Sequence, residues 1–428
     1  MGLPLLLKDD GTAKGLTQIL LTYTLGAAAT LLGLATLWLS CGTLARDIEE
    51  CQIQLVMVKP ISRWEVWLGK WLGILGLNAM LLTLAGLAIF ISLQTRAGRL
   101  SPAEQKMLRN EIFVARASVK ERVPDFGPVI EANVRQRIAS LHATPSPSDV
   151  AEIRKIVTEQ VKAATTEVPP GFRRRWAIDL HALPERTKNE PLEVRIKFHA
   201  ANPNPEATYN TYWMVGPTNS PKVAQLGLVL PPDSFQEFTV PAHLLDENGI
   251  LNIDFYNAND TALTFTIEDG FELLYYENTF GVNFARGIAI IFCWLALLAA
   301  IGLAAASELS FPVAAFASMA ILLMGLSSST LQTVVEEGTI TGFNSTTSSY
   351  GHSPVDLIIV PLFHGTLKVV QLVEGFSPID SLSTGRSITW PMLGMAVAQI
   401  VLLLGGFFCV VGIVLFTRRE LATAQGNA

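Results

Sequence analysis

The stretch GLTQILLTYTLGAAATLLGLATLWLSCGTLA, residues 15–45, contains no charged residue. A helix that crosses the apolar layer of a membrane needs about 20 consecutive, mainly apolar residues, because no water is present there to bond its backbone. Four further uncharged runs of at least this length occur, at residues 71–95, 287–307, 309–335 and 387–417. The sequence therefore predicts a polytopic α-helical membrane protein with five spans. Recurring glycine and alanine in these runs predict close helix packing.

Charged residues are concentrated in the part of the chain between residues 96 and 277. Of the 428 residues, 50% are hydrophobic and 16% are charged, against about 25% charged in typical soluble domains. The net charge of −6 shows no basic excess, so no nucleic-acid partner is expected. The four cysteines lie in or beside the apolar runs, so neither a disulfide framework nor a cysteine metal site is expected in the charged part.

The charged part is predicted to be an inserted extracytoplasmic α+β domain, with a helical region at residues 96–190 and a β-sandwich at residues 191–280. Serine–proline pairs followed by a carboxylate, at residues 101–104 and 146–149, are typical of helix starts. Alternation of apolar with other residues is typical of half-buried strands. It recurs at residues 192–198, 251–255, 263–267 and 271–275. Short strands at this spacing indicate a sandwich.

The flanking membrane parts are predicted at residues 1–95 and 281–428, and the second contains a more polar helix at residues 357–375. Its polar residues fall on one helical face and are His364, Lys368, Gln371 and Glu374. Because charge inside a span is costly, the pattern favours an interfacial or re-entrant helix that contacts membrane lipid. A sixth span whose polar groups face the helix bundle stays open as an alternative.

The segment between the first two apolar runs, residues 42–70, holds the most informative set of polar residues. In order along the chain these are Arg46, Asp47, Glu49, Glu50, Lys59, Pro60, Ser62, Arg63, Glu65, Gly69 and Lys70. A short amphipathic helix with an acidic side is suited to docking in the groove of a partner. Proline ends such a helix, and the Ser-x-x-Glu pattern caps the next one. Arg63 and Lys70 are expected to meet lipid headgroups.

This order of residues closely resembles the cytoplasmic loop of ABC-2 type transporter permeases, in which an acidic short helix, a Lys-Pro turn and a Gly-Lys pair follow one another. The resemblance covers roughly residues 16–91 and 281–421, including the turn at Ser310 to Pro312 and the final Arg418-Arg419-Glu420. It leaves the inserted domain unexplained. Permeases of this family have six spans, and the first is missing here, so residues 1–15 look like the external loop that would follow it.

The resemblance implies a permease subunit of an ATP-driven exporter in the plasma (inner) membrane. It implies a second copy or a related permease as one partner and two cytoplasmic ABC ATPase subunits, which bind ATP and magnesium, as the others. Lysine and arginine in residues 42–70 and at Arg418-Arg419 place both segments in the cytoplasm by the positive-inside rule. The inserted domain then faces outward, where an extracytoplasmic protein or glycan is the expected partner.

The sequence carries no motif for chemistry of its own. It contains no GxxxxGK[ST] loop, no HExxH and no GxSxG, so we expect no catalytic residue, no metal site and no cofactor in this chain. The substrate-binding residues and the cargo are not predicted. The alternative function is a membrane-anchored scaffold or sensor whose β-sandwich binds an extracytoplasmic ligand without transport.

Overall fold

The structure of the chain is a computed structural model. It describes residues 13–121, 125–140, 147–181, 192–201, 207–217, 223–241, 244, 249–267, 269–337, 340, 343–344, 349–350 and 355–419. The chain forms two compact units, Met1–Ala115 with Asn278–Ala428 and Arg116–Glu277. We term them the helical unit and the sandwich unit. Most of the predicted external loop at residues 1–15 lies outside the described residues.

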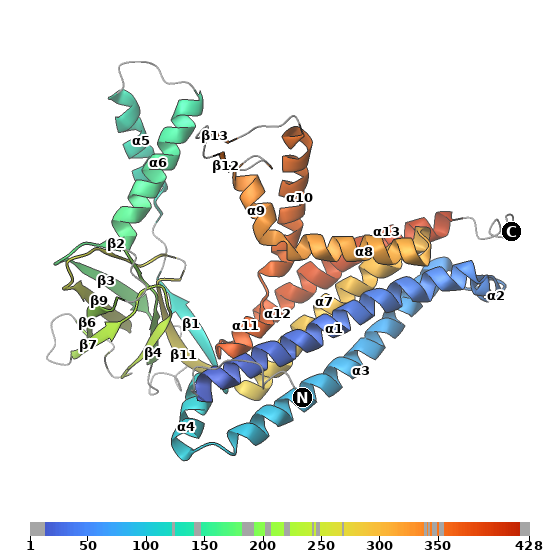
Figure 1. Cartoon of the computed structure of the whole chain (residues 1–428), viewed down its shortest axis with the longest axis horizontal. Coiled ribbons are helices and arrows are strands. Elements are labelled where there is room, and N and C mark those ends of the chain that lie inside the picture. The colour runs from blue at the N-terminus through green and yellow to red at the C-terminus, as the bar shows by residue number, and fades with distance from the viewer. Residues whose placement is uncertain are drawn as a thin grey trace. The chain divides into compact units, whose positions relative to one another are not determined.

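The helical unit is built on four long helices (Figure 1). They are α1 (Ala13–Glu49), α3 (Arg63–Ala97), α7 (Phe280–Glu308) and the composite helix α12 (Trp390–Ala396), η4 (Val397–Gly405) and α13 (Gly406–Arg418). The shorter elements are α2 (Gln52–Met57), α4 (Pro102–Glu111), α8 (Phe311–Leu326), α9 (Ser328–Glu337), β12 (Phe343–Asn344), β13 (Ser349–Tyr350), α10 (Asp356–Glu374) and α11 (Pro378–Ser383). Helix α4 begins with the predicted capping box between Ser101 and Glu104.

Five helical segments of the described chain are long and apolar enough to cross a membrane. They are Gly15–Glu49, Arg63–Ala97, Phe280–Glu308, Asp356–Ser383 and Trp390–Arg418. The prediction of a polytopic membrane protein with a separate β-sheet region is confirmed at this level. Four of the five segments coincide with predicted runs, because an uncharged stretch of this length has few stable alternatives to a helix in an apolar layer.

The prediction of one span over residues 309–335 is wrong. Helix α8 ends at Leu326 and α9 begins at Ser328. Sixteen residues rise about 24 Å, which is less than the roughly 30 Å of a bilayer core. Serine hydroxyls compete for backbone carbonyls at this point, as where Ser327 Oγ donates to Leu323 O over 2.9 Å. The segment Asp356–Ser383 overlaps the helix that we predicted to be interfacial or re-entrant. Unlike α8, it is long enough to cross a membrane, with 28 residues.

Helix α10 exposes both polar and apolar residues, among them Leu357 and Ile358. His364, Lys368, Gln371 and Glu374 are all exposed, whereas Leu367 is buried. Helices α9 and α10 pack against each other (Figure 1). Ser328 Oγ at the start of α9 donates to the Glu374 carboxylate over 2.7 Å, so a polar contact joins the two helices.

Helix α7 is the centre of the helical unit. Two-thirds of its most apolar window (67%) is buried, a larger share than in any other of the five candidate spans. Glycines let neighbouring helices of this unit approach closely, as predicted. A Cβ on Gly302 of α7 would overlap the Ser40 hydroxyl of α1 and lie 3.3 Å from Cys41 Sγ. A Cβ on Gly412 of α13 would lie 2.8 Å from Trp67 Nε1 of α3.

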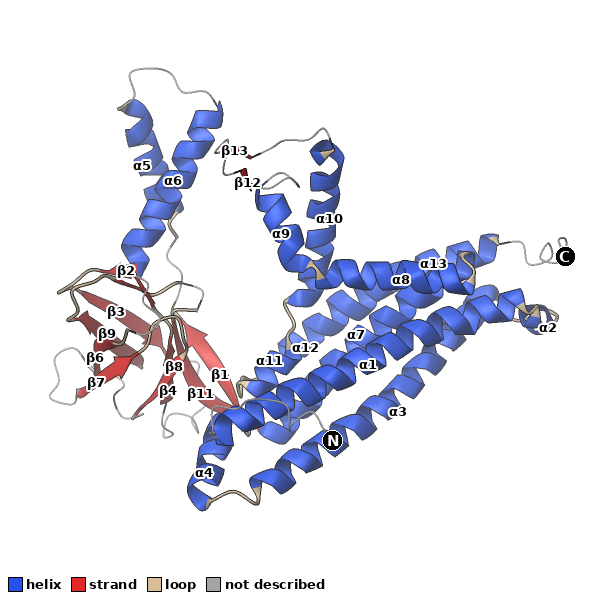
Figure 2. Ribbon diagram, in the orientation of Figure 1, coloured by secondary structure: helices blue, strands red, loops and turns tan. Residues whose placement is uncertain are grey.

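The sandwich unit contains two four-stranded sheets, ordered β1-β11-β4-β8 and β3-β9-β6-β7, and a small sheet ordered β2-β10-β5. Strands are red in Figure 2. Their bounds are β1 (Val114–Lys120), β2 (Glu167–Val168), β3 (Arg173–Asp179), β4 (Leu192–Ile196), β5 (His199–Ala200), β6 (Tyr209–Val215), β7 (Ala224–Leu230), β8 (Gln236–Val240), β9 (Ile250–Asn257), β10 (Leu263–Thr264) and β11 (Phe271–Thr279). Helices α5 (Gly127–Ala139) and α6 (Pro147–Thr166) complete the unit.

The predicted separate β-sheet region is confirmed, but its predicted start at residue 191 is wrong. Strands β1, β2 and β3 all precede that residue and lie within the region predicted to be helical. Strand β3 pairs with β9 along its whole length and supplies Trp176, whose ring stacks on Phe271 with centroids 4.6 Å apart. Three consecutive arginines, Arg173–Arg175, begin this strand, so it lacks the alternation of apolar and polar residues by which the other strands were predicted.

Candidate coupling site

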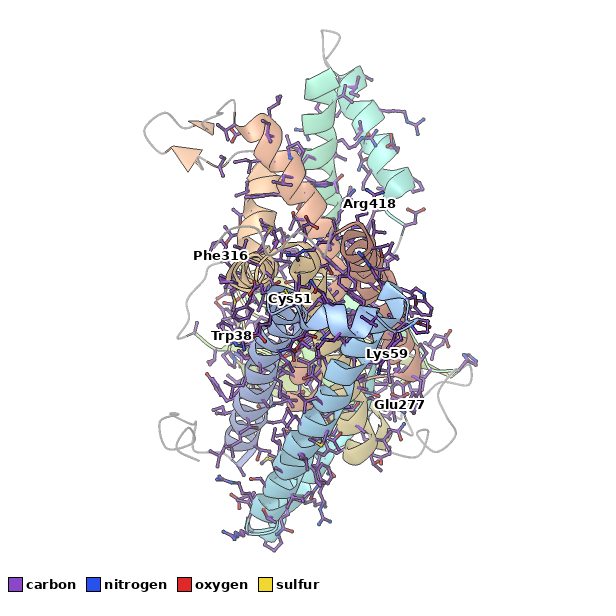
Figure 3. The ribbon with its side chains drawn as sticks, turned by 90° about the vertical axis from the view of Figure 1, so that its right-hand side faces the viewer. Trp38, Cys51, Lys59, Glu277, Phe316 and Arg418 are labelled. Atoms are coloured by element: carbon purple, nitrogen blue, oxygen red, sulfur yellow. The ribbon has the colours of Figure 1, made fainter. Side chains whose placement is uncertain are left out.

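Residues 46–70 lie where α1, α2 and α3 meet at one end of the helical unit. Helix α1 stops at Glu49, and Cys51 takes a left-handed backbone conformation with φ of 59°. The chain then forms the two turns of α2 before α3 starts at Arg63. Figure 3 looks onto this end, with Cys51 and Lys59 marking the two ends of the α2 segment. The predicted short helix is present, but it contains none of the predicted acidic residues.

Helix α3 starts with the predicted Ser-x-x-Glu box. The backbone N–H of Ser62 donates to Glu65 Oε2 over 2.8 Å, which is the Glu65 half of the capping box. One turn later the fully buried Trp67 donates from Nε1 to Ser307 Oγ of α7 over 3.2 Å. The start of α3 is therefore fixed in its own backbone and tied to a neighbouring helix.

Arg63 binds the C-terminal end of α13 rather than standing free for a lipid headgroup. Its Nη1 donates to the carbonyl oxygens of Phe416, Thr417 and Arg419 over 2.8, 2.8 and 2.9 Å. A helix C-terminus carries partial negative charge and unpaired carbonyls, so a guanidinium is well suited to this position. Arg419 in turn donates to Ser307 O near the end of α7 over 3.2 Å. The ends of α3, α7 and α13 thus form one polar network.

Lys70 also has partners within the chain. Its ammonium lies 2.5 Å from Asp47 Oδ2 and donates to Thr43 O over 3.0 Å, both in the last turns of α1. A cation near a helix C-terminus interacts favourably with the helix dipole. The pair therefore joins α1 to α3 beside the short helix that connects them.

Glu49 and Arg46 connect the end of α1 to the start of α8. The backbone N–H of Phe311 donates to Glu49 Oε1 over 2.9 Å, so a carboxylate caps the N-terminus of α8. The Arg46 guanidinium lies 4.6 Å from the centroid of the Phe311 ring, within the range of a cation–π contact. Five helix ends are thus connected through the segment.

The remaining predicted residues lie on the surface around α2. Glu50 accepts a hydrogen bond from Gln52 over 2.7 Å, and Lys59, Pro60 and Gly69 are exposed. The sequence reading missed the apolar side chains between them. Leu55 is 76% exposed and Val58 is 85% exposed, whereas Ile53 is buried and holds α2 against the bundle. The uninterrupted apolar run from Leu55 to Val58, between Gln54 and Lys59, was the signal in the sequence that could have identified them.

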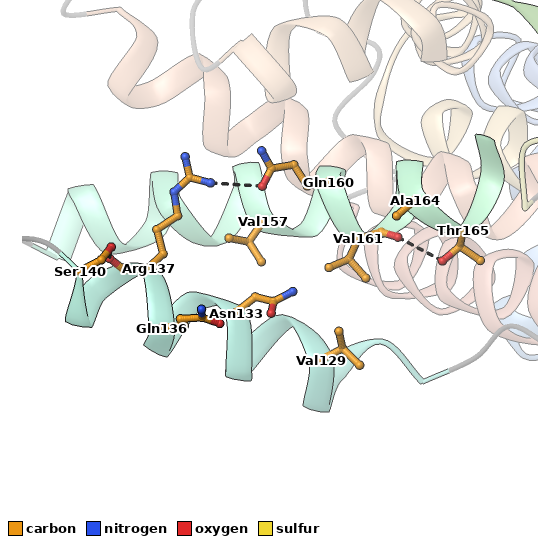
Figure 4. A pocket seen from close by; sticks show the side chains of 10 residues that line it. All are labelled: Val129, Asn133, Gln136, Arg137, Ser140, Val157, Gln160, Val161, Ala164 and Thr165. Atoms are coloured by element: carbon orange, nitrogen blue, oxygen red, sulfur yellow. Dashed lines mark hydrogen bonds between the residues drawn. The ribbon is translucent and has the colours of Figure 1, made fainter. Parts of the chain in front are cut away.

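A second candidate for binding is an open groove of about 580 Å³ between α5 and α6 of the sandwich unit. Figure 4 shows its valine and amide lining, with Arg137 Nη1 donating to Gln160 Oε1 over 3.2 Å. The lining mixes Val129, Val157 and Val161 with uncharged polar groups, so it does not indicate one class of ligand. No group of residues suited to a metal ion occurs in the part of the chain that the structure describes.

No known protein family, curated protein or solved structure matches this chain. The assignment of a function therefore depends on the residues and contacts given above.

Proposed function

We propose that this chain is the permease subunit of an ABC-2 type ATP-driven transporter. The observation that supports the proposal is the network at residues 46–70, in which polar contacts connect the ends of α1, α3, α7, α8 and α13 beside the exposed short helix α2. ATP and magnesium would bind to separate ATPase subunits on the same side as α2. The working unit would contain two permeases, either two copies of this chain or this chain and a relative, in the plasma (inner) membrane.

The network offers a physical route for coupling. Leu55 and Val58 expose the apolar surface that a groove on an ATPase would cover. Movement of α2 would act on α1 and α3 directly, on α13 through Arg63 and on α8 through Glu49. Hydrogen bonds to charged groups contribute about 1.5–3 kcal/mol each, so these contacts favour joint movement of the helices. Displaced helices would then export the substrate, or work on an extracytoplasmic protein or glycan.

The side of the membrane that α2 faces is the first test. A single cysteine replacing Val58, in a chain whose native cysteines are replaced by alanine, is expected to react with a membrane-impermeant maleimide only after the cells are permeabilised. The matched control is a cysteine replacing Val229, which is 63% exposed in the sandwich unit and is expected to react in intact cells. Labelling of the first variant from outside would exclude contact with a cytoplasmic ATPase.

The second test introduces a charge on α2. Leu55→Asp is expected to abolish co-purification of the chain with its ATPase, because a buried unpaired carboxylate opposes docking. Val229→Asp places the same charge at an exposed apolar position of the other unit and should leave co-purification unchanged. Equal recovery of the ATPase with both variants would contradict docking at α2. A wild-type chain that binds no ATPase would instead favour a membrane-anchored scaffold or sensor.

A further inference from the structure

Arg286, in the second turn of α7, is a buried cation without an acidic partner among the described residues. It is 4% exposed, and its Nη1 donates to Ile388 O over 2.8 Å. Its Nε is buried and has no hydrogen-bond partner. A comparable buried arginine of the sandwich unit, Arg116, forms ion pairs with Glu193 and Glu237. A buried guanidinium normally needs such an anion, because removing its charge from water is costly.

The surroundings of Arg286 are held in place by a second polar side chain of α7. Asn283 Nδ2 donates to Arg386 O over 2.7 Å, and Asn283 Oδ1 accepts from the backbone N–H of Ile388 over 2.7 Å. Asn283 is fully buried. These two bonds fix residues 386–388 against α7, so the carbonyl that Arg286 contacts belongs to an ordered segment.

An aromatic ring separates the guanidinium from the surface. The Arg286 Cζ atom lies 4.5 Å from the centroid of the Trp390 ring, and Trp390 is 65% exposed. Two turns further along the same composite helix, and on the same side as Trp390, Val397 is 38% exposed. Rotation of the Trp390 side chain would uncover the guanidinium on this apolar side of the helix, which is the kind of surface that an acyl chain fits.

We propose that Arg286 binds a phosphate group at this end of α7, with Trp390 as the side chain that covers the site. The planar guanidinium matches phosphate geometry, and Nε is a donor that has no other partner. The phosphate belongs either to the headgroup of a membrane lipid or to free phosphate. The exposed apolar residues beside the site fit the lipid. The proposal does not depend on the transport function.

The test measures the thermal stability of the purified full-length chain in detergent with three added probes: didecanoyl phosphatidylglycerol, dioctanoylglycerol without a phosphate, and inorganic phosphate. A ligand that binds only the folded state raises the unfolding temperature. We expect phosphatidylglycerol to raise it and dioctanoylglycerol to leave it unchanged. Arg286→Gln is expected to weaken phosphatidylglycerol binding at least tenfold. Arg286→Lys keeps the charge without the planar fork and is expected to give an intermediate loss.

Arg99→Gln is the matched control, because it removes one positive charge from an exposed position in the helical unit. It should bind phosphatidylglycerol as the wild type does. If inorganic phosphate also raises the unfolding temperature, free phosphate is a ligand of the same site. The proposal would be overturned if the wild type and Arg286→Gln bound phosphatidylglycerol equally. It would also be overturned if neither phosphatidylglycerol nor inorganic phosphate raised the unfolding temperature of the wild type. If Arg286→Gln cannot be purified, equal dissociation constants for the wild type and Arg286→Lys would overturn it.

Discussion

Replacing Gly302 by leucine is expected to destabilise the helical unit by about 3 kcal/mol or more, the upper end of the usual cost of overpacking. The Cβ alone would overlap the Ser40 hydroxyl and lie 2.9 Å from Ser40 Cβ. Rotation of the serine hydroxyl would relieve the first contact. The second contact involves an atom fixed to the backbone of α1, so α1 and α7 would have to separate.

The destabilisation is measured as the change in the denaturation midpoint of the purified chain in mixed micelles. Gly76→Leu is the matched control, since Gly76 lies in α3 and a Cβ there would meet no atom within 4 Å. We expect Gly76→Leu to unfold close to the wild type. If both variants lost a similar amount of stability, the effect of leucine would have a cause other than the contact between α1 and α7.

The parts of the fold that the sequence predicts are those decided within a short stretch of chain. An uncharged run such as residues 71–95 has to satisfy its backbone bonds locally in an apolar layer, so it forms part of α3. Ser62 and Glu65 cap α3 with atoms only three residues apart. In both cases the interaction that decides the structure can be read from neighbouring residues.

Other features depend on contacts between distant residues, and the sequence could not provide them. Arg63 contacts carbonyls more than 350 residues away, so nothing near it distinguishes a helix cap from a headgroup ligand. Arg195 falls on the polar side of the alternating stretch at residues 192–198, yet it is buried, and its Nη1 lies 3.5 Å from Oε1 of the buried Glu272. Alternation predicts two faces of a strand, but it does not show whether the polar face is covered.

Ion pairing near the strand ends also changes the expected protonation in the sandwich unit. Partial burial of Asp269 would raise its pKa, but hydrogen bonds from Lys197 and Thr266 outweigh it, so the pKa of Asp269 lies below its ordinary value. A carboxyl whose pKa is lower in the folded state stabilises the fold above its unfolded pKa and loses that contribution as the pH falls through the folded value. These bonds therefore contribute stability at neutral pH.

Arg63→Ala is expected to destabilise the helical unit by about 2–4 kcal/mol, because it removes charge-assisted hydrogen bonds and leaves carbonyls at the end of α13 without this donor. Arg63→Lys should recover part of the loss, since an ammonium also donates to carbonyls. The matched control is Lys59→Ala, which removes an exposed cation from the same segment and should change stability by less than about 0.5 kcal/mol. Denaturation in mixed micelles measures all three.

The same variant separates docking from coupling. Arg63 contacts the end of α13, whereas Leu55 in α2 and Val58 directly after it form an exposed apolar surface. Arg63→Ala should therefore still co-purify with the ATPase, while ATP hydrolysis should no longer respond to the permease, because movement of α3 is not passed to α13. Leu55→Asp should lose both co-purification with the ATPase and the response of ATP hydrolysis to the permease. If Arg63→Ala kept the response of the wild type, the α13 contact would serve stability alone, and α1 and α3 would have to transmit the movement without it.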